Sequence, residues 1–353
     1  MSNFILIALS ILLLAFLIAA AKRKIFKKVW LRRLVNVTAI IAIVVMVLTV
    51  ALFPDLPGVK TMGEFAYTVQ TLELADNSRV ETYKDDGSFR KLSVLVYSPE
   101  TAEKCPLIVF SHGGISTNTS NVSLYAELAS RGYVVAAISH TYHAISTKID
   151  GKSIFINSAY MRELNTENSY ENIENSYELF QKWMALRTDD ISFVIDYFAA
   201  GGFAIVDAER IGVAGHSLGG SAALGVARQR SDVSAVLALE SPFMSDITGV
   251  DGGNFVWNTA PYDCAVMNIY SDSGYPLLES DNKYVQNKNY LYNSGNVEYY
   301  YIEGSNHYSL CDLVRMSPLL CQLLGGGYEK SGYDTLAFIN EKSAAFFDKY
   351  LRD

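Results

Sequence analysis

Two long uncharged segments near the N-terminus limit what this 353-residue chain can fold into. The first covers residues 4–21 (FILIALSILLLAFLIAAA) and the second covers residues 34–53 (LVNVTAIIAIVVMVLTVALF). As helices they reach about 27 and 30 Å, close to the hydrocarbon thickness of a bilayer. A signal peptide is the alternative for the first segment and a buried core helix for the second. The start Met1-Ser2-Asn3 lacks the basic residues of a signal peptide, and neither segment has the polar stripe of a core helix.

We therefore expect residues 1–57 to be a membrane anchor with two transmembrane helices, followed by a globular domain over residues 58–353. The connector between the helices, residues 22–33 (KRKIFKKVWLRR), carries seven Lys and Arg residues. Such a cluster favours a cytoplasmic connector, which places the globular domain on the other side of the membrane. A basic segment that attracts anionic lipid is compatible with the same topology.

The charge of the two parts differs in sign. Residues 1–57 have a net charge of +6, and the remaining chain, with 22 basic and 36 acidic side chains, has a net charge of −14. A globular part this acidic is unsuited to nucleic acid, whose phosphates need basic partners. Four cysteines are too few for a disulfide scaffold and lack zinc-ligand spacing. Cys311 and Cys321 can pair in an oxidising compartment, whereas a reducing one keeps them as thiols.

The globular part alternates between strand and helix patterns, which predicts an α/β fold with a mostly parallel, doubly wound sheet. Strands are expected at residues 65–74, 92–97, 106–111, 133–138, 210–214, 233–239, 265–270 and 297–302, and helices at 123–130, 183–198, 221–227 and 335–351. An acidic segment, residues 163–178 (ELNTENSYENIENSYE), repeats Glu-Asn-Ser-Tyr-Glu after seven residues. It is interpreted as a solvated helix, with a lid over a site as the alternative.

The run Gly215-His216-Ser217-Leu218-Gly219 has the pattern G-x-S-x-G. A strand-like run enters it and a helix rich in small residues leaves it. This context is typical of a nucleophile elbow, a tight strand-to-helix turn that exposes the serine hydroxyl above the sheet. The first N–H groups of the following helix point at the reacting centre. A glycine-rich helix start without a catalytic role is the alternative.

A second loop has the composition of an oxyanion hole. His112-Gly113-Gly114 follows the expected strand PLIVFS. A loop in this position can give one backbone N–H to a developing oxyanion, and the residue after the nucleophile gives the other. The two expected donors are therefore Gly114 and Leu218. Alone, the His-Gly-Gly run is compatible with a simple turn.

The general base is expected to be one of five histidines. His112 and His216 belong to the loop and the elbow, and His140 and His143 precede the serine in the chain. The order serine, acid, histidine that this architecture requires leaves His307, directly after the last expected strand.

Two carboxylates can serve as the acid that orients the histidine. Glu240 follows the strand VLAL, and Asp272 follows VMNIYS. Both lie at carboxyl ends of expected parallel strands, where sites in such sheets form. The sequence pattern alone leaves the two open.

Several segments resemble the platelet-activating-factor acetylhydrolase family, the plasma-type, calcium-independent branch of the α/β-hydrolases with its bacterial relatives. They are PLIVFSHGG, YAELASRGYVVAAISH, IGVAGHSLGG, LALESPF and EGSNHYSL, within a similarity from about residue 67 to about residue 313. The resemblance implies an α/β-hydrolase fold with Ser217 as nucleophile, Glu240 as acid and His307 as base. The family usually has aspartate at the acid position, so Glu240 departs from its pattern, as does the two-span anchor.

Together these features predict a membrane-anchored serine hydrolase that cleaves carboxylic esters through an acyl-enzyme. The resemblance implies short-acyl or lipid esters. The expected partners are the ester substrate and the membrane, with no nucleic acid, metal or organic cofactor. The alternatives are a different α/β-hydrolase specificity, such as a polyester, a carboxylester or a peptide bond, and a catalytically silent membrane-tethered domain.

Overall fold

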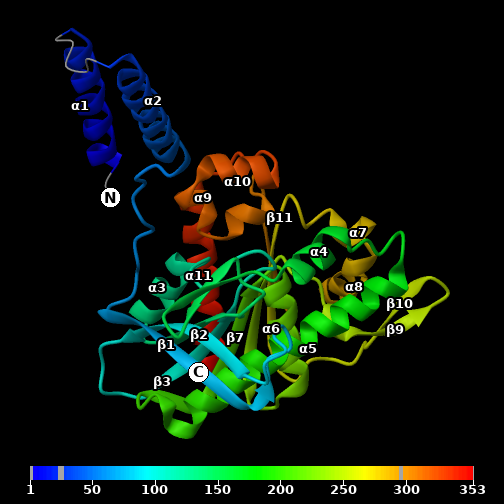
Figure 1. Ribbon diagram of the computed structural model, residues 1–353. Helices are drawn as coiled ribbons and strands as arrows, with labels where there is room; N and C mark the ends of the chain where they lie inside the picture. Colours follow the sequence, from blue (N-terminus) through cyan, green and yellow to red (C-terminus); the bar gives the residue numbers. More distant parts are fainter. Residues whose placement is uncertain (1–2, 23–27, 294–296, 353) are drawn as a thin grey trace. The chain divides into compact units, whose positions relative to one another are not determined.

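The apolar runs of the globular part form one eight-stranded sheet (Figure 1). The computed structural model describes residues 3–22, 28–293 and 297–352. The strands are β1 (Tyr67–Val80), β2 (Phe89–Pro99), β3 (Cys105–Ser111), β4 (Val134–Ser139), β7 (Val206–His216), β8 (Val233–Leu239), β11 (Ala265–Ser271) and β12 (Val297–Ile302), in the spatial order β1-β2-β4-β3-β7-β8-β11-β12. β2 is antiparallel to both its neighbours, and the six strands from β4 to β12 are parallel. The predicted mostly parallel α/β sheet is confirmed.

Helices cover both faces of this sheet. The chain moves from β3 to β4 in one direction and from β7 to β8 in the other. Because such crossovers are right-handed, their helices lie on opposite faces. α3 (Val122–Ser130) accordingly contacts α11 (Gly332–Leu351), whereas α6 (Leu218–Gln229) contacts α5 (Ile173–Tyr197). Strands β3, β4 and β11 are buried along their whole length, since helices cover them on both sides.

The strand register brings the expected functional residues to one edge. Ser111 of β3 is level with Gly215 of β7, and His216 of β7 is level with Leu239 of β8. The last residues of these strands therefore end side by side. The loops that follow β3, β7, β8, β11 and β12 carry all the candidate catalytic groups. This is the edge where open parallel sheets form their sites.

Smaller elements lie outside the eight-stranded sheet. They are the hairpins β5 (Ser146–Ile149) with β6 (Lys152–Phe155) and β9 (Ile247–Asp251) with β10 (Asn254–Trp257), and the helices α4 (Ser158–Thr166), α7 (Leu277–Ser280) and α8 (Val285–Asn293). β1 is longer than expected and ends at Val80, because it stays paired with β2 as far as Phe89.

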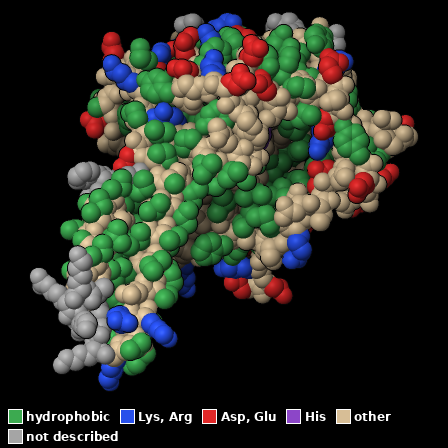
Figure 2. Space-filling view, turned by 90° about the horizontal axis from the view of Figure 1, so that it is seen from above, with side chains coloured by type: hydrophobic (Ala, Val, Ile, Leu, Met, Phe, Trp, Pro, Cys, Tyr) green, Lys and Arg blue, Asp and Glu red, His purple; other side chains and the backbone are tan. Residues whose placement is uncertain are grey.

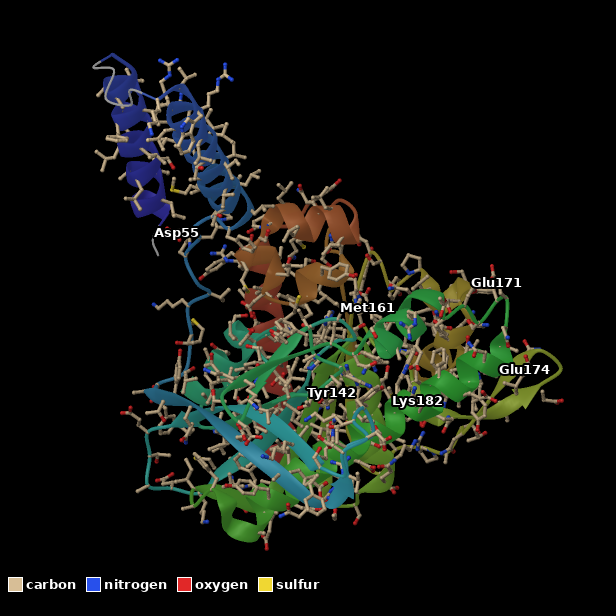
Figure 3. All side chains as sticks on the ribbon, in the orientation of Figure 1. Asp55, Tyr142, Met161, Glu171, Glu174 and Lys182 are labelled. Atoms are coloured by element: carbon tan, nitrogen blue, oxygen red, sulfur yellow. The ribbon has the colours of Figure 1, made fainter. Side chains whose placement is uncertain are left out.

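The acidic segment over residues 163–178 forms the end of one helix and the start of the next. The expected single helix is interrupted because the Asn172 side chain accepts the backbone N–H of Asn175 and caps a new helix, α5. Glu171 and Glu174 point into solvent at this end of the molecule (Figure 3). The solvated character of these acids is therefore as expected.

The N-terminal helices form a compact unit of their own. α1 (Asn3–Lys22) pairs with α2 (Val29–Leu52), and α9 (Leu313–Met316) and α10 (Pro318–Gly325) group with them, while residues 59–312 and 328–353 form the second unit. Ala39 is the one residue of α2 that is buried. Figure 2 shows hydrophobic side chains along the helix pair and Lys and Arg side chains near one end.

Among the described residues, α2 is long and apolar enough to cross a membrane. α1 contains a shorter apolar stretch, Leu6–Ala20. The prediction of two spans is therefore supported for one helix, and the first span stays a prediction. Residues 23–27 of the basic connector lie outside the described residues.

Candidate active site

The G-x-S-x-G run forms a sharp turn between β7 and α6. Ser217 has φ 55° and ψ −127°, a backbone conformation that costs a non-glycine residue free energy and is found mostly at functional sites. Its N–H donates to the carbonyl of Leu239 at 2.8 Å, which fastens the turn to the neighbouring strand. A methyl group on Gly219 would lie 2.1 Å from the Ser111 carbonyl oxygen, so glycine is required there. The half-buried Ser217 side chain stands at the top of the sheet, as a nucleophile elbow requires.

Glu240 and His307 lie in contact. Oε1 of Glu240 is 3.1 Å from Nδ1 of His307, and Oε2 accepts the backbone N–H of Ser271 at 2.7 Å. Glu240 also has a positive φ, 48°, which turns its side chain back toward the sheet edge directly after β8. The carboxylate is almost fully buried, and both of its oxygens are engaged. The structure thus joins the acid and the histidine that the resemblance implies.

Asp272, the other candidate acid, contacts the loop before His307. It is exposed, and its carboxylate accepts the N–H of Gly304 at 3.1 Å and the hydroxyl of Tyr301 at 2.7 Å. Gly304 begins the turn that leads to His307, so Asp272 holds the loop that carries the histidine rather than the imidazole ring.

His216, next to the nucleophile, supports the histidine from the other side. Its Nε2 lies 3.0 Å from the backbone carbonyl oxygen of His307, and the two rings are 4.6 Å apart. Burial, together with the electrostatic effect of the neighbouring His307, holds the pKa of His216 well below its usual value. A neutral His216 donates its Nε2 proton to that carbonyl and so positions the His307 backbone.

The loop over residues 112–114 lies against the elbow. A methyl group on Gly113 would lie 3.5 Å from Cβ of Ser217, and one on Gly114 would lie 3.7 Å from Cδ2 of Leu218. Leu218 is the first residue of α6, where backbone N–H groups have no partner within the helix. The two predicted oxyanion donors, Gly114 and Leu218, are therefore neighbours beside the serine.

Helix α4 covers this loop. The Tyr160 hydroxyl donates to the Gly114 carbonyl at 3.2 Å, and a methyl group on Gly114 would lie 3.6 Å from Leu164. Glu163 joins α4 to α5, because it accepts the indole N–H of Trp183 at 3.0 Å and the ammonium of Lys182 at 2.5 Å. α4 thus lies over residues 112–114, the oxyanion loop, and the lid interpretation of the acidic segment stays a prediction.

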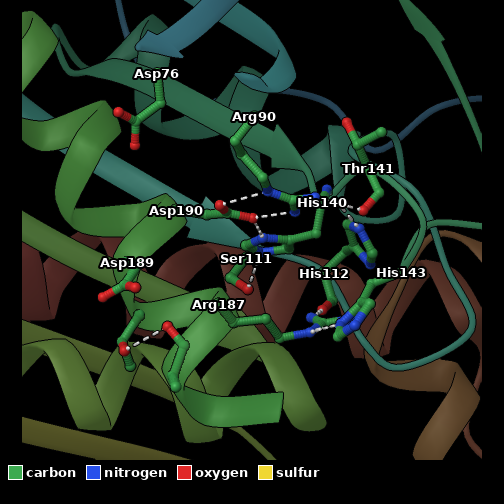
Figure 4. Close-up of polar contacts among 12 residues, drawn as sticks. Asp76, Arg90, Ser111, His112, His140, Thr141, His143, Arg187, Asp189 and Asp190 are labelled. Atoms are coloured by element: carbon green, nitrogen blue, oxygen red, sulfur yellow. Dashed lines mark hydrogen bonds and ion pairs between the residues drawn. The ribbon is translucent and has the colours of Figure 1, made fainter. Parts of the chain in front are cut away.

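The histidines that precede the serine belong to a buried polar cluster (Figure 4). Asp190 of α5 accepts from Arg90 at 2.6 Å and from Nδ1 of His140 at 2.9 Å, and Nε2 of His140 lies 2.8 Å from the Ser111 hydroxyl. Burial and the charge of Arg187 lower the pKa of His140 to about 4. Although burial opposes it, the Arg90 charge keeps the pKa of Asp190 below its usual range. His140 is therefore a neutral structural residue.

The residues that hold the site in place were not predicted from the sequence. Arg187 belongs to the buried face of α5, at helical spacing from Phe180, Trp183 and Ile191. A charged residue at helical spacing from these apolar residues was the available signal. Gly274 carried no such signal, because its role arises only from its closeness to Glu240 in the fold. Among the residues that the structure describes, no cluster suited to a metal ion occurs.

Parts of the chain match the models of two known protein families. Residues 88–194 match the family model of platelet-activating factor acetylhydrolase, isoform II, and residues 152–295 match that of the prolyl oligopeptidase family. The first match contains the oxyanion loop, and the second contains Ser217 and Glu240. Both models describe hydrolytic enzymes. A search of curated proteins gives no match.

Solved structures show the same fold. A ferulic acid esterase from Streptomyces cinnamoneus superposes with a TM-score of 0.63 at 22% identity, covering 83% of this chain and 92% of its own. A dienelactone hydrolase-like promiscuous phosphotriesterase, P91, from metagenomic libraries superposes with a TM-score of 0.51 at 12% identity, covering 81% of this chain and 99% of its own. The α/β-hydrolase fold and the resemblance to the acetylhydrolase family are confirmed, as is the assignment to the hydrolytic enzymes.

Proposed function

We propose that the chain is a membrane-anchored serine esterase with Ser217, His307 and Glu240 as its catalytic residues. The observation that carries the proposal is the contact between Nδ1 of His307 and the buried carboxylate of Glu240, at the strand edge that also presents the strained Ser217 turn. A carboxylate in this position selects the imidazole tautomer that leaves Nε2 free to accept the serine proton.

In the proposed reaction, Ser217 Oγ attacks the ester carbonyl while His307 Nε2 takes its proton. The negative charge that develops on the carbonyl oxygen is stabilised by the N–H groups of Gly114 and Leu218. His307 then gives the proton to the leaving alcohol, which departs and leaves an acyl-enzyme. Water, activated by His307, hydrolyses this ester and restores Ser217.

The substrate class that we favour is a short-acyl or lipid ester. Its support is the acetylhydrolase match over residues 88–194, the named activity of the esterase whose fold the chain shares, and the apolar helix α2, which would hold the enzyme at a lipid surface. Peptide bonds are a second candidate, because residues 152–295 match the prolyl oligopeptidase family. In the proposed topology the catalytic domain lies outside the cytoplasm.

A substrate series with the full chain in detergent micelles tests the proposal. p-Nitrophenyl esters from acetate to palmitate report the acyl preference, and p-nitroanilide peptides report the competing activity. We expect turnover of the esters, with a preference for short acyl groups, and its loss in Ser217→Ala. Turnover of the anilides with inert esters would overturn the esterase assignment in favour of a peptidase.

A further inference from the structure

Arg187 is the largest fully buried side chain among the described residues. Its guanidinium donates hydrogen bonds to the oxyanion loop. Nη1 donates to the backbone carbonyl of His112 at 2.5 Å (Figure 4). Nη2 donates to the backbone carbonyl of Gly113 at 3.2 Å. The planar fork of an arginine matches two successive carbonyls, which a lysine cannot do with one nitrogen. One side chain from the middle of α5 thus sets the conformation of the loop.

This buried charge has no carboxylate partner in the part of the chain that the structure describes. Its other contacts are Nδ1 of His143 and the Tyr160 hydroxyl, each at 3.4 Å. Burial, and then the charge of Arg187, hold the pKa of His143 well below its usual value, so that histidine is neutral. The nearby carboxylate of Asp190 is engaged by Arg90 and His140. A positive charge without an ion-pair partner therefore lies directly behind the oxyanion loop.

The geometry of the peptide bond connects Arg187 to the oxyanion donor. The carbonyl of Gly113 and the N–H of Gly114 belong to one planar peptide unit and point in opposite directions. Because Arg187 and Nδ1 of His112, at 2.7 Å, both hold the Gly113 carbonyl, the Gly114 N–H is turned away from them. A donor bound to that carbonyl also polarises the peptide unit and strengthens its N–H as a donor.

Tyr160 fixes the next peptide unit in the same way. Its hydroxyl donates to the Gly114 carbonyl at 3.2 Å, and its ring stacks on His143 with the centroids 3.6 Å apart. Three successive carbonyls of the loop, those of residues 112, 113 and 114, are thus held by Arg187 and Tyr160. The loop has no peptide unit left that can rotate without breaking one of these bonds.

We propose that Arg187 is a positioning residue of the oxyanion hole, which aims the Gly114 N–H at the reacting oxygen and adds a buried positive charge behind it. The inference rests on the proposed function, since it assigns a role in the reaction of Ser217. It predicts that Arg187 acts on the tetrahedral state and leaves substrate binding unchanged.

The test compares Arg187→Lys, Arg187→Met and Tyr160→Phe with a matched control, Arg228→Lys. Arg228 is a partly buried arginine on α6 that pairs with Asp246 at 2.8 Å and has no contact with the oxyanion loop. For each full-length variant we would measure kcat and KM with a p-nitrophenyl ester, the concentration of reactive serine with a fluorophosphonate, and the melting temperature. The inhibition constant of a trifluoromethyl ketone, which forms a tetrahedral adduct with an oxyanion, provides the decisive value.

For Arg187→Lys we expect kcat per titrated serine to fall by about 10- to 100-fold with KM nearly unchanged, and the ketone inhibition constant to rise by a similar factor. Arg187→Met should show a larger loss and Tyr160→Phe a smaller one in the same direction. Arg228→Lys should change the melting temperature but neither of these values. A purely structural role of Arg187 would lower the titrated serine concentration and leave the ketone constant unchanged.

Unchanged kcat per serine and an unchanged ketone constant in Arg187→Lys would overturn this role. If both Arg187 variants fail to fold, the Tyr160→Phe variant decides the question. An unchanged kcat per serine and an unchanged ketone inhibition constant in that variant would overturn the proposed role of these contacts to the oxyanion loop. Absence of reaction between the unaltered protein and both the ketone and the fluorophosphonate would instead overturn the proposed function, and the role of Arg187 with it.

Discussion

Nδ1 of His307 lies 3.1 Å from Oε1 of Glu240, although the two residues are 67 positions apart and follow different strands. The other oxygen of Glu240 accepts the Ser271 N–H at the end of β11, which lies between those two strands in the sheet. The buried carboxylate is thereby fixed in direction, and the imidazole with it. Glu240 makes this contact from a backbone position with a positive φ, directly after β8.

The exchange Glu240→Gln should lower kcat by about 10⁴, because it removes the charge that stabilises the imidazolium and permits the wrong tautomer. Asp272→Asn is the matched control, since it removes a charge at the end of the next strand. It weakens the contacts to Gly304 and Tyr301 only, so its effect on kcat should be far smaller. Steady-state kinetics on an ester measures kcat for both variants. A strongly reduced kcat in Asp272→Asn together with a nearly unchanged kcat in Glu240→Gln would contradict the assignment of Glu240 as the acid.

A substitution at Gly274 provides a second test of the role of the Glu240 carboxylate. A methyl group there would lie 2.4 Å from Cγ of Glu240, closer than the atoms can approach. Gly274→Ala should therefore displace Glu240 from His307 and lower kcat by about 10²-fold or more, within the range of losses at the acid of the triad. Gly249→Ala, at a position with open space within 4 Å, is the control and should leave kcat unchanged. Equal kcat values in both variants would show that Glu240 is not catalytic.

Local patterns were sufficient for the nucleophile but not for the acid. The turn around Ser217 is a property of five consecutive residues, so the sequence indicates it directly. Glu240 and Asp272 both follow parallel strands, and the difference between them is the direction of each side chain, set by backbone conformation and by neighbours from other strands. No periodicity of apolar residues contains that information.

The contacts that hold the oxyanion loop were even harder to predict from the sequence. Arg187 is one charged residue in a long amphipathic helix, and its burial depends on α5 packing against β3. The break between α4 and α5 was hidden because the acidic segment has helical character on both sides. The sheet, by contrast, followed from continuous apolar runs, which are a strong signal for strands buried on both faces.

The buried histidines predict a pH dependence of stability. His140, with its pKa lowered to about 4, remains neutral in the folded protein, whereas in the unfolded chain it takes up a proton near pH 6.5. Stability is therefore fully present above pH 6.5 and is lost as the pH falls toward 4, by up to about 3 kcal/mol for this residue. Burial lowers the pKa of His112, His143 and His216 too, so their effects have the same sign.

Urea unfolding of the full chain in detergent, followed by tryptophan fluorescence, checks this effect at several pH values between 8 and 5. The free energy of unfolding should stay level from pH 8 to 7 and then decrease. Asp190, whose pKa is below its usual range, acts only at lower pH and does not disturb this window. A free energy of unfolding that is constant or increases from pH 7 to 5 would refute the prediction.

The proposed topology predicts which part of the chain a protease can reach. Because positive charge favours a cytoplasmic position for residues 22–33, this topology predicts that protease added to intact cells or protoplasts degrades the domain that begins near residue 58. The basic segment should be cut only after the membrane is permeabilised. Protection of the catalytic domain in intact cells would reverse the topology.

Covalent labelling of Ser217 tests directly whether this chain is a serine hydrolase. The full-length protein would be treated with a fluorophosphonate, digested with trypsin and analysed by mass spectrometry. We expect one phosphonate on Ser217, in the peptide Ile211–Arg228. In Ser217→Ala we expect no label and an ester turnover below about a thousandth of that of the unaltered protein. An unlabelled Ser217 in a protein that still hydrolyses esters would contradict the assignment of Ser217 as the nucleophile.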